Sequence, residues 1–100
     1  MVVKILIKRR FKPENLDQAT KILIRARYEA MKMEGYIASE TWRDLRDPNQ
    51  IVVVSMWQTH EAWNKWYASG QRREFTMEMG KIMVEEERIE PYELGLSQKR

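Results

Sequence analysis

The sequence contains no cysteine among its 100 residues. This absence excludes a disulfide-bonded scaffold, a cysteine zinc site, an iron–sulfur cluster and a thiol nucleophile. Glycine is scarce, and the four glycines stand apart from one another, so no glycine-rich loop can cradle a phosphate. A single histidine, His60, leaves no histidine cluster for a metal ion. We therefore expect neither a metal nor a cofactor.

Long hydrophobic runs and a strong charge imbalance are also missing. No stretch approaches the roughly 18 consecutive apolar residues of a membrane-spanning helix. The apolar start, MVVKILI, is too short for a signal-peptide core with its cleavage site. The formal net charge of +3, from 18 basic and 15 acidic residues, is too small to indicate nucleic-acid binding by itself. We expect a cytoplasmic protein that binds neither membranes nor nucleic acids.

The composition is that of one globular domain. Hydrophobic residues make up 43% and charged residues 33% of the chain, which is too apolar for a disordered chain. A second complete domain does not fit in this length. We expect one domain over residues 1–97 and a frayed tail over residues 98–100.

Hydrophobic periodicity indicates the order of the elements. Strands are predicted over residues 2–11, 36–44, 51–57 and 88–96. Helices are predicted over residues 14–34, after a capping Thr59 as far as Gly70, and over residues 71–83. Gly35 is expected to cap the first helix, and Pro91 places the last strand at an edge or a bulge. The order β-α-β-β-α-β predicts an α+β, ferredoxin-like fold, a four-stranded antiparallel sheet with its helices on one face.

The second face of this sheet also carries apolar side chains, and no segment remains to cover it. A second copy of the chain is the simplest cover, so we expect a homodimer packed sheet to sheet. The basic run over residues 8–12 alternates across both faces of its strand and is not one continuous surface. The acidic run over residues 85–87 is a candidate partner for it, within the chain or across the dimer.

The segment over residues 57–75, WQTHEAWNKWYASGQRREF, carries the most distinctive pattern. A tryptophan ends a strand, a threonine caps a helix, and a Glu-Ala-aromatic triplet precedes Trp66 and a serine-containing break. This pattern resembles the antibiotic biosynthesis monooxygenase family, and the element order resembles it over about residues 2–96. The resemblance implies a dimeric α/β barrel. Some members of the family oxidise quinols or anthrones with dioxygen and no cofactor, another branch degrades haem, and many have no established activity.

The haem-degrading branch uses a tryptophan in the second helix, a later histidine and an asparagine in the first strand. Trp66 matches the tryptophan, but the histidine position falls near Thr76, and residues 67–80 contain no histidine. The first strand contains no asparagine. Without an axial ligand for iron, haem degradation is not expected.

A monooxygenase without cofactor needs a substrate that reduces dioxygen itself, such as a phenolate or a carbanion. The protein then supplies a base or hydrogen bonds to form that anion, and a pocket that excludes water. By resemblance, Trp66 is the first candidate for a catalytic residue. His60 is a candidate acid–base group because its ordinary pKa is near neutrality, and Tyr67 is a candidate hydrogen-bond donor at the rim of the pocket.

Four further residues are candidates for binding the substrate. Trp63 and Phe75 can form aromatic walls for a flat ring system, and Arg72 and Arg73 can attract an acidic group. Core packing is the more frequent role of such an aromatic residue, and a solvated face is the more frequent place of such an arginine pair. The alternative function is therefore a non-catalytic, small-molecule-binding or interaction dimer of the same fold. An open cavity with polar groups pointing inward would favour the enzyme, and a filled one the alternative.

Overall fold

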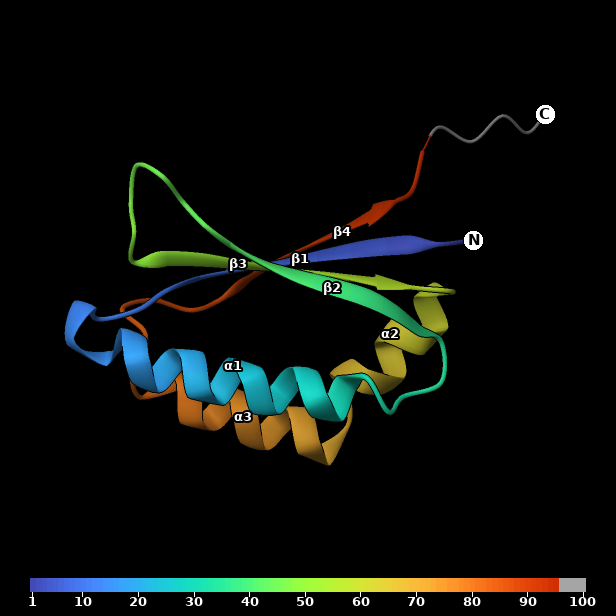
Figure 1. Cartoon of the computed structure of the whole chain (residues 1–100). Coiled ribbons are helices and arrows are strands. Elements are labelled where there is room, and N and C mark those ends of the chain that lie inside the picture. Colours follow the sequence, from blue (N-terminus) through green and yellow to red (C-terminus); the bar gives the residue numbers. More distant parts are fainter. Residues whose placement is uncertain (96–100) are drawn as a thin grey trace.

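The computed structural model describes residues 1–95 of the chain. Four strands form one antiparallel sheet in the order β2-β3-β1-β4: β1 (Val3–Arg10), β2 (Tyr36–Arg43), β3 (Gln50–Trp57) and β4 (Arg88–Glu93). Three helices lie on one face of this sheet (Figure 1): α1 (Leu16–Ala30), α2 (His60–Tyr67) and α3 (Gly70–Gly80). The predicted α+β, ferredoxin-like fold is confirmed. The tail expected over residues 98–100 lies outside the described residues.

Strand β1 shows how the sequence builds the core. Its residues alternate between buried and partly buried, with Val3, Ile5, Ile7 and Arg9 facing the helices. Each pairs with a residue of β3 on the same face, at Trp57, Ser55, Val53 and Ile51. Two-residue periodicity therefore sets which side chains line the space between the sheet and the helices.

Strand β4 forms one edge of the sheet, as Pro91 predicts. Pro91 lies opposite Ile5 of β1, and its missing N–H is tolerated because no further strand pairs with β4 in the described sheet. Strand β3 lies inside the sheet between β2 and β1, in agreement with its near-continuous apolar sequence.

The end of the first helix differs from the prediction. Helix α1 ends at Ala30, not near residue 34, and its C-terminal capping residue is Met31. Gly35 lies beyond the helix with φ of 91°, and its carbonyl accepts a hydrogen bond of 2.7 Å from the Gln58 amide. A Cβ at Gly35 would lie 2.5 Å from the Cβ of Ala62. Gly35 is therefore required for close approach to α2 and is not the helix cap.

The second helical region divides as the sequence indicates, with shifted bounds. The Thr59 side chain accepts from the Ala62 amide at 3.0 Å and caps α2. Ser69 caps α3 in the same way through the Arg72 amide at 3.2 Å, so α3 begins at Gly70 and ends at Gly80. The expected helical piece over residues 71–83 was therefore too long at its C-terminal end.

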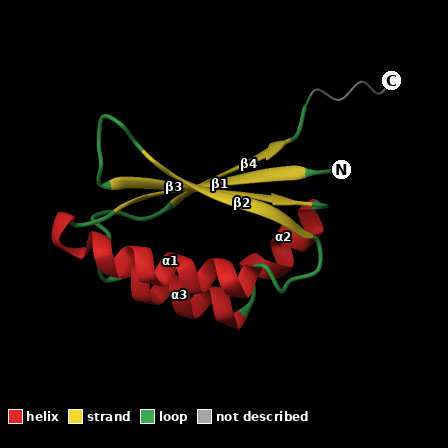
Figure 2. Cartoon of the chain, in the orientation of Figure 1, coloured by secondary structure: helices red, strands yellow, loops and turns green. Residues whose placement is uncertain are grey.

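The two faces of the sheet differ in cover. Figure 2 shows all three helices below one face, and no element of the described chain over the other. The uncovered face carries Leu6, Val52 and Val54, with Trp42 and Tyr92 about half exposed. No helix in residues 1–95 combines the length and apolar character that a bilayer-spanning segment requires.

Candidate functional site

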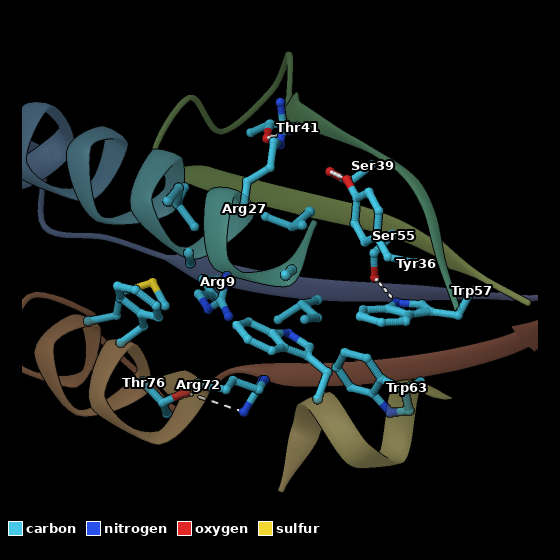
Figure 3. A pocket seen from close by; sticks show the side chains of 18 residues that line it. Arg9, Arg27, Tyr36, Ser39, Thr41, Ser55, Trp57, Trp63, Arg72 and Thr76 are labelled. Atoms are coloured by element: carbon cyan, nitrogen blue, oxygen red, sulfur yellow. Dashed lines mark hydrogen bonds between the residues drawn. The ribbon is translucent and has the colours of Figure 1, made fainter. Parts of the chain in front are cut away.

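A cavity of about 60 Å³ lies between the sheet and the helices (Figure 3). Residues from β1, β2, β3, α1, α2 and α3 line it. Its aromatic wall consists of Tyr36, Trp57, Trp63, Trp66 and Phe75. The cavity is thus apolar over most of its lining and lies where the sequence places the aromatic candidates.

A chain of aromatic contacts fixes one side of the cavity. The rings of Tyr36 and Trp57 meet edge to face, with centroids 5.4 Å apart. Trp57 contacts Trp63 with centroids 6.0 Å apart, and Trp63 contacts Tyr67 at 5.8 Å. Trp57 is fully buried, and its indole N–H donates to Ser55 Oγ at 3.0 Å. These contacts hold the tryptophan rings in defined positions.

The polar part of the lining is held mostly by hydrogen bonds within the protein. The Tyr36 hydroxyl and Ser39 Oγ lie 2.7 Å apart. Arg27 of α1 donates to Thr41 of β2 at 2.7 Å, and both side chains reach solvent. This contact therefore lies at an exposed part of the cavity, where α1 approaches β2.

Two arginines reach the cavity from opposite layers, Arg9 from β1 and Arg72 from α3 (Figure 3). Arg9 Nε donates to Glu87 Oε1 at 2.9 Å, and Arg72 Nη2 donates to Glu87 Oε2 at 3.0 Å. Arg72 Nη1 also donates to Thr76 Oγ1 at 3.3 Å. The exposed fractions are only 6% for the Arg9 side chain and 8% for that of Arg72. One carboxylate therefore holds two buried guanidinium groups, and the triad carries a surplus positive charge.

Burial raises the pKa of Glu87, but the charges of Arg9 and Arg72 outweigh it and hold the pKa below its ordinary value. Burial lowers the pKa of Arg9, and Glu87 opposes this effect. Glu87 is therefore a carboxylate at neutral pH and the counter-ion of the triad.

Within residues 1–95, the lining includes no aspartate, glutamate, histidine or lysine. Its charged members are Arg9, Arg27 and Arg72. The hydroxyl groups in this described lining are those of Tyr36, Ser39, Thr41, Ser55 and Thr76. The cavity lining in the described part of the chain consequently favours an anion and offers no carboxylate or imidazole base.

The structure brings together four of the seven residues that the sequence singles out. Trp63, Trp66, Phe75 and Arg72 all line the cavity and are buried. Tyr67 is 52% exposed and lies behind Trp63, with the Arg72 guanidinium carbon 4.8 Å from its ring centroid.

The other two candidates do not join this group. His60, the first residue of α2, and Arg73 of α3 are exposed and lie outside the lining. Thr76, near the position where the haem-degrading branch has its histidine, lines the cavity and bonds to Arg72. The chain's single histidine therefore does not line this cavity.

Sequence reasoning missed Arg9 and the polar residues of β2 and β3. Arg9 lies on the same strand face as Ile5 and Ile7, so strand periodicity already placed it toward the helices. The expected pairing of the basic and acidic runs is confirmed within the chain: Arg9 binds Glu87, and Arg10 binds Glu85 at 3.4 Å.

The sequence pattern of the antibiotic biosynthesis monooxygenase family matches residues 2–78. The chain belongs to this family. No curated protein matches it significantly. Membership agrees with the resemblance seen over residues 57–75 and with the observed order of the elements.

Several solved structures share the fold of this monooxygenase family member over nearly its whole length. A conserved protein from Methanosarcina mazei Go1 is 18% identical, with a TM-score of 0.86, over 92% of this chain and 91% of that one. Rv0793 from Mycobacterium tuberculosis is 9% identical, with a TM-score of 0.86, over 99% and 100%. SnoaB from Streptomyces nogalater, a cofactor-independent oxygenase, is 10% identical, with a TM-score of 0.84, over 99% and 98%. At these identities the similarity shows the fold alone.

Proposed function

We propose that this protein is a monooxygenase that uses dioxygen and no cofactor to oxidise a phenolic or quinol-like aromatic compound. The supporting observation is the cavity, which combines aromatic walls with three guanidinium groups and, among the described residues, no acidic side chain. Such an environment stabilises an organic anion, and the anion is the form that donates an electron to dioxygen. The cofactor-independent oxygenase SnoaB, which has the same fold, supports the same proposal.

The reaction balances without a further reductant. The bound phenolate transfers electrons to dioxygen, and a C–O bond forms at the carbon para to the phenolate oxygen. The O–O bond then breaks as the C–H proton at that carbon is lost. One oxygen atom remains on the ring as a quinone carbonyl, and the other leaves as water. The phenol is oxidised and dioxygen is reduced.

The cavity residues divide into two roles in this proposal. Trp63, Trp66 and Phe75 form walls for the ring and exclude water from the reacting carbon. Arg72 contributes positive charge toward the phenolate oxygen, and Tyr67 supports it by lying against its guanidinium group. None of the lining residues that the structure describes is a carboxylate or imidazole base, so in this proposal the anion comes from ionisation of the substrate itself.

Oxygen consumption tests this proposal directly. The protein, treated with a chelator, is mixed in an oxygen electrode with a single-ring phenol, a naphthol or anthrone. We expect uptake above the protein-free rate, with one atom of labelled dioxygen in the product. Trp66→Ala is expected to lower the rate about tenfold or more through loss of positioning, whereas His60→Gln leaves it unchanged. Absence of uptake with all three compounds would refute the proposal.

The size of the cavity favours the alternative, a non-catalytic small-molecule-binding or interaction dimer of the same fold. About 60 Å³ is far below the roughly 300–1,000 Å³ of pockets that take drug-sized ligands. The two functions differ in one outcome of the oxygen experiment. An aromatic compound that binds in the cavity and causes no oxygen uptake would support the alternative.

We also propose that two copies associate through the helix-free face of the sheet. Leu6, Val52 and Val54 lie on this face, and the half-exposed Trp42 and Tyr92 flank them. Val52 and Val54 are already buried within one chain, so the exposed apolar area on this face is mainly that of Trp42 and Tyr92, and a second copy would cover it.

A further inference from the structure

We infer that Arg9, fixed by Glu87, is the receptor for an anionic oxygen in the cavity, and that the ligand is a single-ring aromatic anion. The inference rests on the proposed function in one respect, because it takes the same cavity as the substrate site. Binding of such an anion requires no oxygen chemistry and is measurable on its own.

Arg9 uses only part of its hydrogen-bonding capacity within the described chain. Only its Nε bonds to a side chain within residues 1–95, that of Glu87 at 2.9 Å. Its two terminal nitrogens have no hydrogen-bond partner in the described part of the chain, although the residue is 6% exposed. Every side-chain nitrogen in residues 1–95 that is completely buried has a hydrogen-bond partner. The two unpaired terminal nitrogens of Arg9 therefore have accessible surface. Because Arg9 lines the cavity, its terminal N–H groups are available to a molecule inside it.

The charged groups that contact Arg9 do not balance. Glu87, from the segment before β4, neutralises one of two guanidinium groups, and Arg72 from α3 supplies the other. Arg27 from α1 also lines the cavity, together with the hydroxyl-bearing side chains of Tyr36, Ser39, Thr41, Ser55 and Thr76. One positive charge of the triad is thus left over, and the planar fork of Arg9 is suited to a carboxylate or a phenolate oxygen.

The size and shape of the cavity limit the size of the ligand. The space of about 60 Å³ bounded by Trp57, Trp63, Trp66 and Phe75 is smaller than the roughly 150 Å³ cavity that holds benzene, so one flat ring already requires some side-chain movement and three fused rings require much more. A single-ring anion places its ring against these walls and its oxygen toward Arg9. An anthrone would have to displace packed side chains, which close-packed interiors resist.

The experiment uses 4-nitrophenol, whose phenolate absorbs visible light and whose phenol does not. Its absorbance is titrated with pH in the presence of excess wild-type protein without oxygen. We expect the pKa of bound 4-nitrophenol to fall at least about one unit below the free value, equivalent to tenfold tighter binding of the anion. Benzoate is then added as a competitor, to separate a phenolate site from one that also takes a carboxylate.

Three variants locate the effect. Arg9→Met removes the charge and fork and leaves Glu87 paired with Arg72, so we expect about tenfold weaker binding of 4-nitrophenolate. Arg9→Lys keeps the charge without the fork and is expected to lie between Arg9→Met and wild type. Arg10→Met removes the same charge one residue away on the other face, where Arg10 binds Asp47 at 2.8 Å, and leaves binding unchanged.

Each outcome decides the inference. A lowered pKa of bound 4-nitrophenol, lost in Arg9→Met and kept in Arg10→Met, supports it, even where no compound causes oxygen uptake. An unchanged or raised pKa with wild-type protein overturns it without any variant, as does equal loss in Arg9→Met and Arg10→Met. Tighter binding of anthrone than of 4-nitrophenolate overturns the single-ring assignment.

Discussion

Glu87 links the stability of the fold to pH. Its pKa lies below the ordinary value, so its ion pairs stabilise the fold above about pH 4, and this contribution is lost as the pH falls through the lowered pKa. Glu87→Gln leaves two buried guanidinium groups without a counter-charge. We expect it to lower the free energy of unfolding by about 3 kcal/mol at neutral pH.

Urea denaturation at neutral pH and near pH 3 measures this effect. The difference between wild type and Glu87→Gln is expected to shrink at the lower pH, where the wild-type carboxyl group also begins to protonate. The control is Glu85→Gln, because Glu85 is 46% exposed and pairs with Arg10 at 3.4 Å. An exposed pair contributes about 1 kcal/mol or less. A pH-independent difference for Glu87→Gln would contradict the prediction.

Gly35 is the second residue with a measurable role. Alanine at this position must keep φ of 91° and bring its Cβ to 2.5 Å from that of Ala62. We expect Gly35→Ala to lower the free energy of unfolding by about 2 kcal/mol or more, because strain and overpacking add. Gly80→Ala has open space around it and is expected to be neutral or slightly stabilising. Equal effects of the two substitutions in thermal denaturation would argue against the Ala62 contact.

At the scale of elements, the junction between α2 and α3 connects stability to the site. Ser69 Oγ donates to the Trp66 carbonyl at 2.7 Å and accepts from the Arg72 amide at 3.2 Å. Both neighbours line the cavity. Thr59 makes only the equivalent cap for α2, through the Ala62 amide.

We therefore expect Ser69→Ala and Thr59→Ala to lose similar stability, about 1 kcal/mol each. Only Ser69→Ala is expected to weaken binding of 4-nitrophenolate, since it frees the turn that orients Trp66 and Arg72. Urea denaturation and the absorbance titration measure the two quantities separately. Equal weakening of binding in both variants would show that the cap acts through stability alone.

The elements themselves were predictable because their signals are local. The two-residue alternation in β1, the apolar run of β3 and the cap at Thr59 each depend on residues only a few positions apart in the chain. The end of α1 was not predictable, because Gly35 is required by its close approach to Ala62, which is distant in sequence. Contacts of this kind leave no mark in the local pattern.

The site residues also differ in whether local sequence signals could predict them. Trp63, Trp66 and Phe75 were found because helical spacing and family resemblance both place them toward the sheet. Arg9 was missed because its burial depends on Glu87, 78 positions away in the chain. An arginine in a basic run is usually solvated, and only strand parity with Ile5 and Ile7 distinguishes Arg9 from its neighbours.

At the scale of the whole molecule, the uncovered sheet face is where we propose that two copies associate. Trp42 lies on this face of β2 and is 47% exposed, whereas Tyr28 lies on α1 and is 62% exposed. A glutamate in place of Trp42 would bury a charge between two packed sheets, which costs several kcal/mol unless it is paired. The same change at Tyr28 leaves the charge in water if the dimer forms through the sheets.

We therefore expect wild type and Tyr28→Glu to sediment as dimers, and Trp42→Glu to dissociate with a Kd at least about tenfold higher. Sedimentation equilibrium over a range of concentrations gives these constants, and circular dichroism shows that each variant is folded. If Tyr28→Glu dissociates and Trp42→Glu remains a dimer, the contact lies on the helices instead of the sheet. A wild-type protein that is monomeric at every concentration would leave the apolar face of β1, β2 and β3 to a different partner.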